Sequence, residues 1–257
     1  MRTEDRDLLH DVRPGDRWLA VVAHPDDESF GCGSVLAHAA TSGAEVTVLC
    51  ATRGEAGEVT PGTVGPDLGV VREAELRRAA LRLGVTSVEL MGHRDSGFDG
   101  PPDPRSLCAV PADALAAEIG AVLDRHRPDV VVVLDGSDGH RDHLHVRAAV
   151  TAALAGARRP ALYEHCLPNS LMRRWLDEMR RVRPDTAYHS LDPAGLGRPD
   201  AEITDVLDVR GVLDRREAAI AEHRSQTSPF EGLSPALRTA FLAEDHLVRV
   251  HPDRDGA

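Results

Sequence analysis

One histidine and three carboxylates stand together near the start of the chain, in the run His24-Pro25-Asp26-Asp27-Glu28. Carboxylates this close repel one another and raise each other's pKa unless positive charge lies among them. A bound divalent cation would supply that charge, and imidazole and carboxylate groups are ligands for such cations. We therefore interpret this run as part of a metal site.

A second polar run occupies residues 135–143 and ends at His143. His24 and Asp27 are three residues apart, so they share a face if the first run winds into a helix, and His143 can complete a set of two histidines and one carboxylate. Such a set leaves coordination positions open for water, which favours catalysis over structural metal binding. It holds Zn²⁺ well but is also the ligand set of non-haem Fe²⁺, so the ligands leave the metal open.

Two more polar side chains of the second run, His140 and Asp142, have the chemistry of an acid and of a carboxylate that orients an imidazole. Taken alone, residues 140–143 could be a solvated helix N-terminus, and the first run could be an acidic turn. The run Gly31-Cys32-Gly33 could also open a dinucleotide-binding loop, but Leu36 stands where the third glycine belongs. The two runs together favour the metal site.

The elements around these runs alternate between apolar strands and amphipathic helices. Apolar runs at 18–22 and 129–134 predict buried strands directly before the two polar runs, and a helix is expected after each. This alternation predicts an α/β, Rossmann-like, mainly parallel sheet flanked by helices. In the usual winding order strand one lies beside strand four, so the active site is expected at the carboxyl ends of strands one and four.

Charge and composition restrict the partners. The formal net charge of −12 argues against a nucleic-acid surface and against an anionic membrane, because both need clustered Lys and Arg. The first residues lack an apolar signal-peptide core, and no run approaches a membrane span. We expect a cytoplasmic protein with a small-molecule partner, and we leave homo-oligomer formation open.

These residues resemble a known family. Residues 23–28 (Ala-His-Pro-Asp-Asp-Glu) and the pattern His140-x-Asp142-His143 are similar to those of the LmbE or PIG-L superfamily, the zinc-dependent N-deacetylases that act on N-acetylglucosamine-type substrates and related thiol conjugates. Further similar positions are Arg72, Glu73 and Glu75, the run 94–97 (Arg-Asp-Ser-Gly) and the run 221–226 (Ala-Glu-His-Arg-Ser-Gln). Arg141 departs from the family, which often has Pro there.

The resemblance covers most of residues 17–226. It implies a single deacetylase domain over residues 1–257, with a core at 17–226 and a C-terminal segment, 227–250, that we expect to be helical. His223 falls in this region near the end of an expected helix. It could reach the site, but a lone histidine there is more often a C-terminal cap.

By resemblance, the zinc ligands are His24, Asp27 and His143. Asp26 is the general base, and His140 stabilises the oxyanion or protonates the leaving amine. The chemistry is coherent without the family, since a metal with an open site lowers the pKa of bound water toward ~7 and polarises an amide carbonyl. Asp26, beside a ligand but not a ligand itself, can take the proton of that water. The products are a free amine and acetate.

Arg72 and Asp95 are expected to hold sugar hydroxyls, because both follow strands on the rim where the metal is predicted and an Arg fork with a carboxylate suits polyol recognition. The alternative is a surface ion pair of little energetic value.

Two other functions would use the same predicted metal ligands. A metal- or sugar-binding module could have this fold without turnover. Asp26 argues against it, because a binder needs ligands but no spare carboxylate. An Fe²⁺ oxygenase would use the same triad, but on a β framework that the α/β pattern contradicts.

Overall fold

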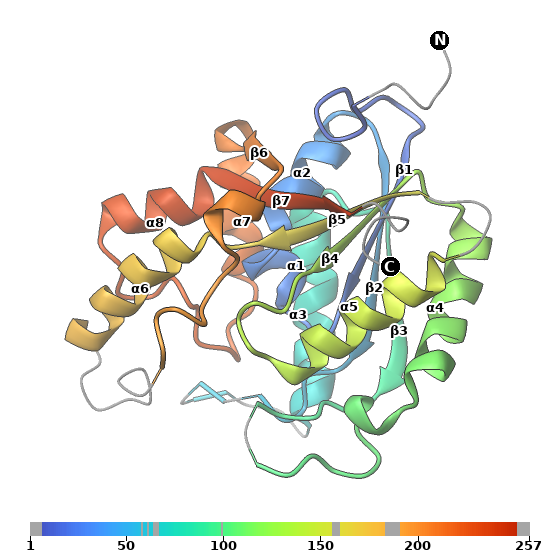
Figure 1. The fold of residues 1–257 in the computed structure, drawn as a ribbon, viewed down its shortest axis with the longest axis horizontal. Coiled ribbons are helices and arrows are strands. Elements are labelled where there is room, and N and C mark those ends of the chain that lie inside the picture. Colours follow the sequence, from blue (N-terminus) through green and yellow to red (C-terminus); the bar gives the residue numbers. More distant parts are fainter. Residues whose placement is uncertain are drawn as a thin grey trace.

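The structure is a computed structural model that describes residues 7–57, 59–60, 62–63, 67–98, 100–155, 160–182 and 191–250. Within these residues one seven-stranded sheet runs through the molecule in the order β3-β2-β1-β4-β5-β7-β6 (Figure 1). The strands are β1 (Arg17–Val22), β2 (Glu45–Thr52), β3 (Ser87–His93), β4 (Val130–Leu134), β5 (Ala161–Cys166), β6 (Asp205–Asp208) and β7 (Glu244–Val250). Strands β1 to β5 pair in parallel, while β7 is antiparallel to both β5 and β6.

Helices cover both faces of this sheet. They are α1 (Asp27–Phe30), α2 (Gly33–Thr41), α3 (Leu68–Leu83), α4 (Ala112–His126), α5 (Arg141–Ala153), α6 (Asn169–Val182), α7 (Leu213–Ile220) and α8 (Pro235–Leu242), with short 3-10 helices at Leu107–Ala109, Asp200–Glu202 and Arg210–Val212. Because side chains alternate along a strand, Trp18 and Ala20 of β1 pack with α2, α3 and α7, whereas Leu19 and Val21 pack with α4 and α5. The predicted α/β fold is confirmed.

Strands β1 and β4 are neighbours, as predicted. They pair in parallel, with Leu19 opposite Val131 and Val21 opposite Val133. β1 ends at Val22 and β4 at Leu134, so the two polar runs leave the sheet from the same edge, side by side. The winding of the chain therefore brings together residues that are more than a hundred positions apart in the sequence.

The prediction of a helical C-terminal segment, 227–250, is only partly right. Helix α8 occupies its middle, but the segment ends in strand β7. Val248 and Val250 are β-branched and favour a strand, and β7 completes the sheet between β5 and β6. Asp245 at its start is buried because it pairs with Arg216 of α7 at 2.9 Å, a contact that local periodicity does not reveal.

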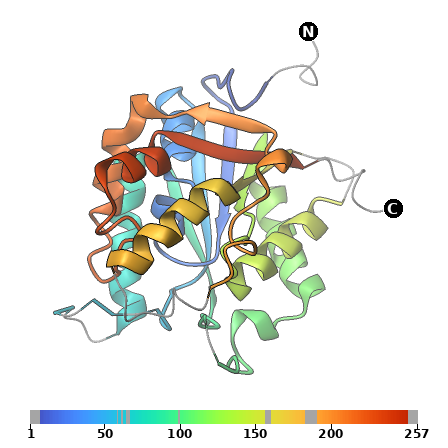
Figure 2. The ribbon, with the colours of Figure 1, turned by 60° about the vertical axis from the view of Figure 1, so that its left-hand side comes forward.

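Helices α6 and α8 lie against each other beside the sheet and form a third apolar cluster (Figure 2). Leu171, Met172, Leu176, Phe230 and Phe241 are among its buried members. No helix in the ranges that the structure describes is long and apolar enough to cross a bilayer.

Candidate metal centre and active site

Asp27 is fixed by the loop that follows β1. Its Oδ2 accepts the backbone N–H groups of Ala23 at 3.1 Å and of His24 at 2.8 Å. These bonds hold the first turn of α1 against the strand end and leave Oδ1 facing His143 Nε2, at 3.2 Å. The short helix α1 thus directs one carboxylate oxygen toward His143, but it begins at Asp27, so His24 lies before it and the two residues do not share a helix face as predicted.

Three predicted ligands converge here. His24 Nδ1 lies 3.6 Å from Asp27 Oδ2, and His143 Nε2 lies 3.2 Å from Asp27 Oδ1. All three side chains are buried, and His143 Nε2 makes no hydrogen bond among the described residues despite this proximity. A buried, unpaired imidazole nitrogen is costly, and a metal ion in contact with it would remove that cost.

The remaining ring nitrogens are each held by a carboxylate. His24 Nε2 donates to Asp142 at 3.1 Å, and His143 Nδ1 donates to Asp138 at 2.7 Å. Metal-bound histidines usually have such partners, which fix the tautomer and leave the other nitrogen with a free lone pair. The donor set therefore fits a divalent metal, and the imidazole that Asp142 orients is that of His24.

The pKa values of the clustered side chains also favour a bound cation. Burial alone would lower the pKa of His143, but Asp27 and Asp138 together raise it to about 10. Burial would raise the pKa of Asp27, yet His143 and His24 hold it well below its usual range. The cluster therefore favours positive charge among its carboxylates, which a divalent cation provides.

Among the described residues, two donor groups have all their ligand atoms within 4.8 Å of one another, and neither is the predicted trio: His24 with His140 and His143, and His24 with Asp95 and Asp142. The second group is already satisfied, because the Asp142 oxygens also accept the Ser96 N–H and the Cys108 thiol. The first group would leave out Asp27, whose Oδ1 lies 3.2 Å from His143 Nε2. The assignment of His24, Asp27 and His143 as the ligands therefore stays a prediction from the sequence.

Asp26 adopts a backbone conformation that is rare for a residue other than glycine, with φ of 117°. Such geometry costs energy and persists only where its surroundings hold it. Here Glu28 Oε2 accepts the Asp26 N–H at 2.9 Å, and Arg72 donates to Asp26 Oδ2 at 2.9 Å and to the carbonyl of Pro25 at 2.5 Å. Burial raises the pKa of Asp26 to about 6, against the opposing charge of Arg72. Asp26 is thus a spare carboxylate beside the ligands.

Glu28 and His223 form a buried support behind Asp26, which sequence reasoning missed. His223 Nε2 lies 2.6 Å from Glu28 Oε1 and 3.2 Å from Ser29 Oγ. His223 is therefore neither a helix cap nor a member of the donor set. No local signal could have paired residues 195 positions apart.

His140 faces the site with one nitrogen. Its Nδ1 accepts the backbone N–H of Asp142 at 3.2 Å, so the neutral ring carries its proton on Nε2. Its ring centre lies 4.5 Å from that of His24 and 4.9 Å from that of His143. Burial, with the two neighbouring imidazoles, lowers the pKa of His140 to about 4.

A polar cavity of about 290 Å³ is lined by the three predicted ligands and by Asp26 and His140. Its wall also includes Arg72, Asp95 and Gln226. Arg72 and Asp95 reach the cavity but do not pair with each other. Arg72 bonds to Asp26 and to two backbone carbonyls, while Asp95 accepts the N–H of Gly97 and lies 3.4 Å from His24 Nε2. Both are buried, so the alternative of an exposed surface ion pair is excluded.

Asp138 lies within the second polar run, but sequence reasoning gave it no role. Replacing it with alanine is expected to lower metal affinity by about 10- to 100-fold, because His143 loses the carboxylate that fixes its tautomer. Titration against a chromogenic chelator measures this affinity. Asp113→Ala, at an exposed position of α4, is the matched control. If both variants bind metal as the parent does, Asp138 does not orient His143.

The sequence profile of the PIG-L family, described as GlcNAc-PI de-N-acetylase, matches residues 19–154, which span both polar runs and the strands that position them. The chain belongs to the PIG-L family. A relative named 1D-myo-inositol 2-acetamido-2-deoxy-alpha-D-glucopyranoside deacetylase, from Geodermatophilus obscurus, is 33% identical and is aligned over 96% of both chains. The predictions of an N-deacetylase and of an N-acetylglucosamine-type substrate are thereby confirmed.

Solved structures share the PIG-L fold. An N,N'-diacetylchitobiose deacetylase from Pyrococcus horikoshii matches with a TM-score of 0.62 and 19% identity, over 92% of this chain and 84% of its own. A 4-carboxy-2-hydroxymuconate hydratase from Pseudomonas putida matches equally well, with a TM-score of 0.62 and 21% identity, over 94% and 99%. The fold alone therefore does not decide the reaction.

Proposed function

We propose that this PIG-L-family enzyme hydrolyses the acetamide of 1D-myo-inositol 2-acetamido-2-deoxy-α-D-glucopyranoside or a close analogue, with zinc held by His24, Asp27 and His143. The observation that carries the proposal is the convergence of these three donors at a cavity that also holds the spare carboxylate of Asp26. The related deacetylase over 96% of the chain supports the substrate. Fe²⁺ fits the same ligands and is the alternative metal.

A divalent metal bound there would lower the pKa of water and polarise the amide carbonyl. Asp26 accepts a proton from the attacking water, whose oxygen bonds to the carbonyl carbon. Nε2–H of His140 donates to the oxygen that becomes negatively charged, because its other nitrogen is engaged by the Asp142 amide. The C–N bond then breaks as the nitrogen takes the proton that Asp26 accepted, so Asp26 is again a carboxylate and the amine leaves beside acetate.

Arg72 and Asp95 are proposed to bind the sugar in the polar cavity. Arg72 Nε is buried and makes no hydrogen bond within the described ranges, so it keeps a donor for a hydroxyl. Gln226 adds an amide to the same wall. Because Arg72 also holds Asp26, substrate binding and placement of the base are joined in one side chain.

The alternative from the sequence, a non-catalytic binding module on the same fold, is not favoured by any of these observations. Asp26 argues against a binding module. Its strained backbone and its hydrogen bond from Arg72 hold a carboxylate in place that is not needed as a metal ligand. A cytoplasmic location stays a prediction from the sequence.

The experiment is amine release by the zinc-loaded protein from a panel of N-acetyl sugars. We expect the glucosaminyl-inositol substrate to be hydrolysed with a higher kcat/KM than free N-acetylglucosamine or diacetylchitobiose, because the inositol adds contacts. A folded, zinc-loaded protein that releases amine from none of them would favour the binding module.

A further inference from the structure

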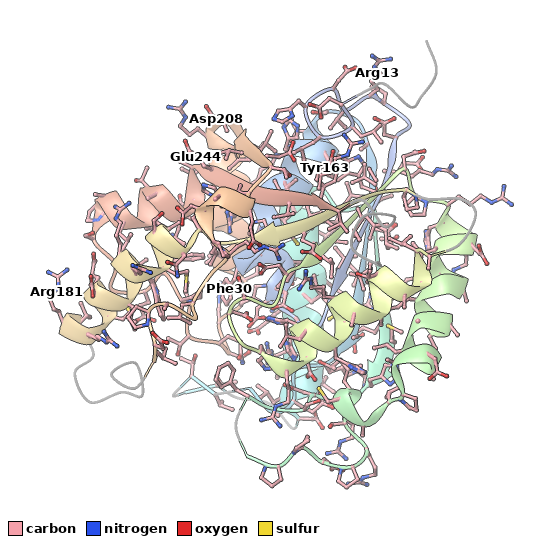
Figure 3. All side chains as sticks on the ribbon, in the orientation of Figure 1. Arg13, Phe30, Tyr163, Arg181, Asp208 and Glu244 are labelled. Atoms are coloured by element: carbon pink, nitrogen blue, oxygen red, sulfur yellow. The ribbon has the colours of Figure 1, made fainter. Side chains whose placement is uncertain are left out.

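A second cavity, of about 360 Å³, adjoins the proposed metal ligands, and Arg72 is not part of its wall. It shares Asp27, Phe98 and His143 with the polar cavity, so the two meet at the ligands. Its wall is mainly carbon and includes Phe30, Met172, Trp175, Leu196, Phe230 and Phe241. Phe30, labelled near the centre of the molecule in Figure 3, extends this wall from α1 toward the α6–α8 cluster.

Among the described residues, most polar groups of the wall are bound by other protein groups, and the exceptions are His143 Nε2 and Asp135 Oδ2. Asp138 binds His143 at 2.7 Å, and His165 Nε2 lies 3.5 Å from Asp245. Asp135 accepts two hydrogen bonds from Ser137 through Oδ1, whereas its buried Oδ2 makes no hydrogen bond within the described ranges and lies 4.0 Å from Arg198. What the cavity offers a ligand is therefore chiefly apolar contact.

We propose that this cavity binds an apolar acyl group longer than acetyl on the amide that the enzyme hydrolyses. The inference rests on the proposed function and deepens it, since the cleavage and the sugar stay the same. An amide carbonyl carries two substituents, the acyl chain and the amine side, which point in different directions. The polar cavity, with Asp95 and Gln226, suits the hydroxyl-rich amine side, so the apolar cavity receives the acyl side.

The volume of this cavity supports an acyl group much longer than the two carbons of acetyl. An apolar cavity of about 150 Å³ accepts the six carbons of a benzene molecule, so one of about 360 Å³ has room for about twelve carbon atoms. Acetyl would leave most of this space without ligand contacts. In the reaction, water adds to the acyl carbon, the C–N bond breaks, and a longer carboxylate leaves with the same free amine.

The test is a series of N-acyl glucosaminides, from acetyl through butanoyl, hexanoyl and octanoyl to dodecanoyl, assayed with zinc-loaded enzyme by amine release. Burial of each methylene is worth about 0.8 kcal/mol, so kcat/KM should rise about fourfold per added CH₂ until the cavity is full. A profile that is flat, or that falls from acetyl onward, would overturn the proposal.

A second series keeps the N-acetyl group and lengthens the alkyl chain on the anomeric oxygen. The proposal expects little change in kcat/KM along it. If the rate rises with this chain and not with the acyl chain, the cavity binds the aglycone and the acyl assignment is wrong.

Variants tie the effect to the cavity. Leu196→Trp should remove the increase in kcat/KM for the octanoyl substrate and keep acetyl turnover. Leu196 belongs to the cavity wall and is neither a proposed metal ligand nor the proposed base. Met172→Ala should move the optimum toward longer chains. Met179→Ala, the same change at a buried position of α6 outside the cavity wall, should leave the optimum in place. Equal shifts in Met172→Ala and Met179→Ala would contradict the proposal.

The two hypotheses fail separately. Loss of turnover for every acyl length rejects the deacylase function itself. Normal acetyl turnover with no dependence on acyl length rejects only the acyl-binding role of this cavity.

Discussion

Replacement of Asp26 by asparagine is expected to lower kcat by about 10²- to 10⁴-fold while the protein keeps its metal. Asparagine preserves the shape of the side chain but cannot accept the proton of the attacking water. Asp26 is not one of the three converging donors, and its contacts are with Arg72 and Glu28. Metal content and initial rate, measured on the same preparation, check both halves of this expectation.

Asp27→Asn is the matched comparison, because it removes a carboxylate one position away. It should lower metal content and activity together, since Asp27 Oδ1 faces His143 and its Oδ2 faces His24. A fully active Asp26→Asn variant would refute the role of Asp26 as base. An Asp26→Asn variant that loses metal as severely as Asp27→Asn would show that the ligands are assigned wrongly.

His140→Ala is expected to lower kcat by about 10²- to 10³-fold, the usual effect of removing one donor to a developing oxyanion. Its Nδ1 is bound to the Asp142 amide, so the ring presents Nε2–H toward the cavity. Metal content and KM should change little, because the donor acts mainly on the transition state.

His145→Ala is the control, since His145 lies in α5, the helix that His140 caps, its Nε2 bonds to the carbonyl of Val110, and it does not line the polar cavity. It should keep parental kcat. A His140→Ala variant with normal kcat but reduced metal content would mean that His140 is a ligand, as one of the alternative donor groups implies.

The strands and the pairing of β1 with β4 could be predicted because they depend on patterns that are local or topological. Continuous apolar runs such as 129–134 indicate buried strands, and the winding of α/β folds then brings both polar runs to one edge. For the same reason His24, Asp27 and His143 could be proposed as neighbours before their distances were known.

The supporting contacts could not be predicted, because they join residues through the folded chain alone. Nothing in the sequence near Glu28 predicts its contact with His223. The role of Asp138 depends on a loop that brings its carboxylate to His143, five residues later in the chain. The apolar cavity is likewise built from α1, α6 and residues after α7, whose apolar positions read simply as core. Strand β7 was missed because its place is set by β5 and β6.

The most direct test of the account is the rate of amine release from the N-acetylglucosaminyl-inositol substrate before chelation, after chelation, and after zinc is restored. The account predicts that the metal-free protein stays folded, loses hydrolysis, and regains it with about one zinc per chain, since a single facial triad holds one ion. Metal-free protein that hydrolyses this substrate at the original rate would contradict it.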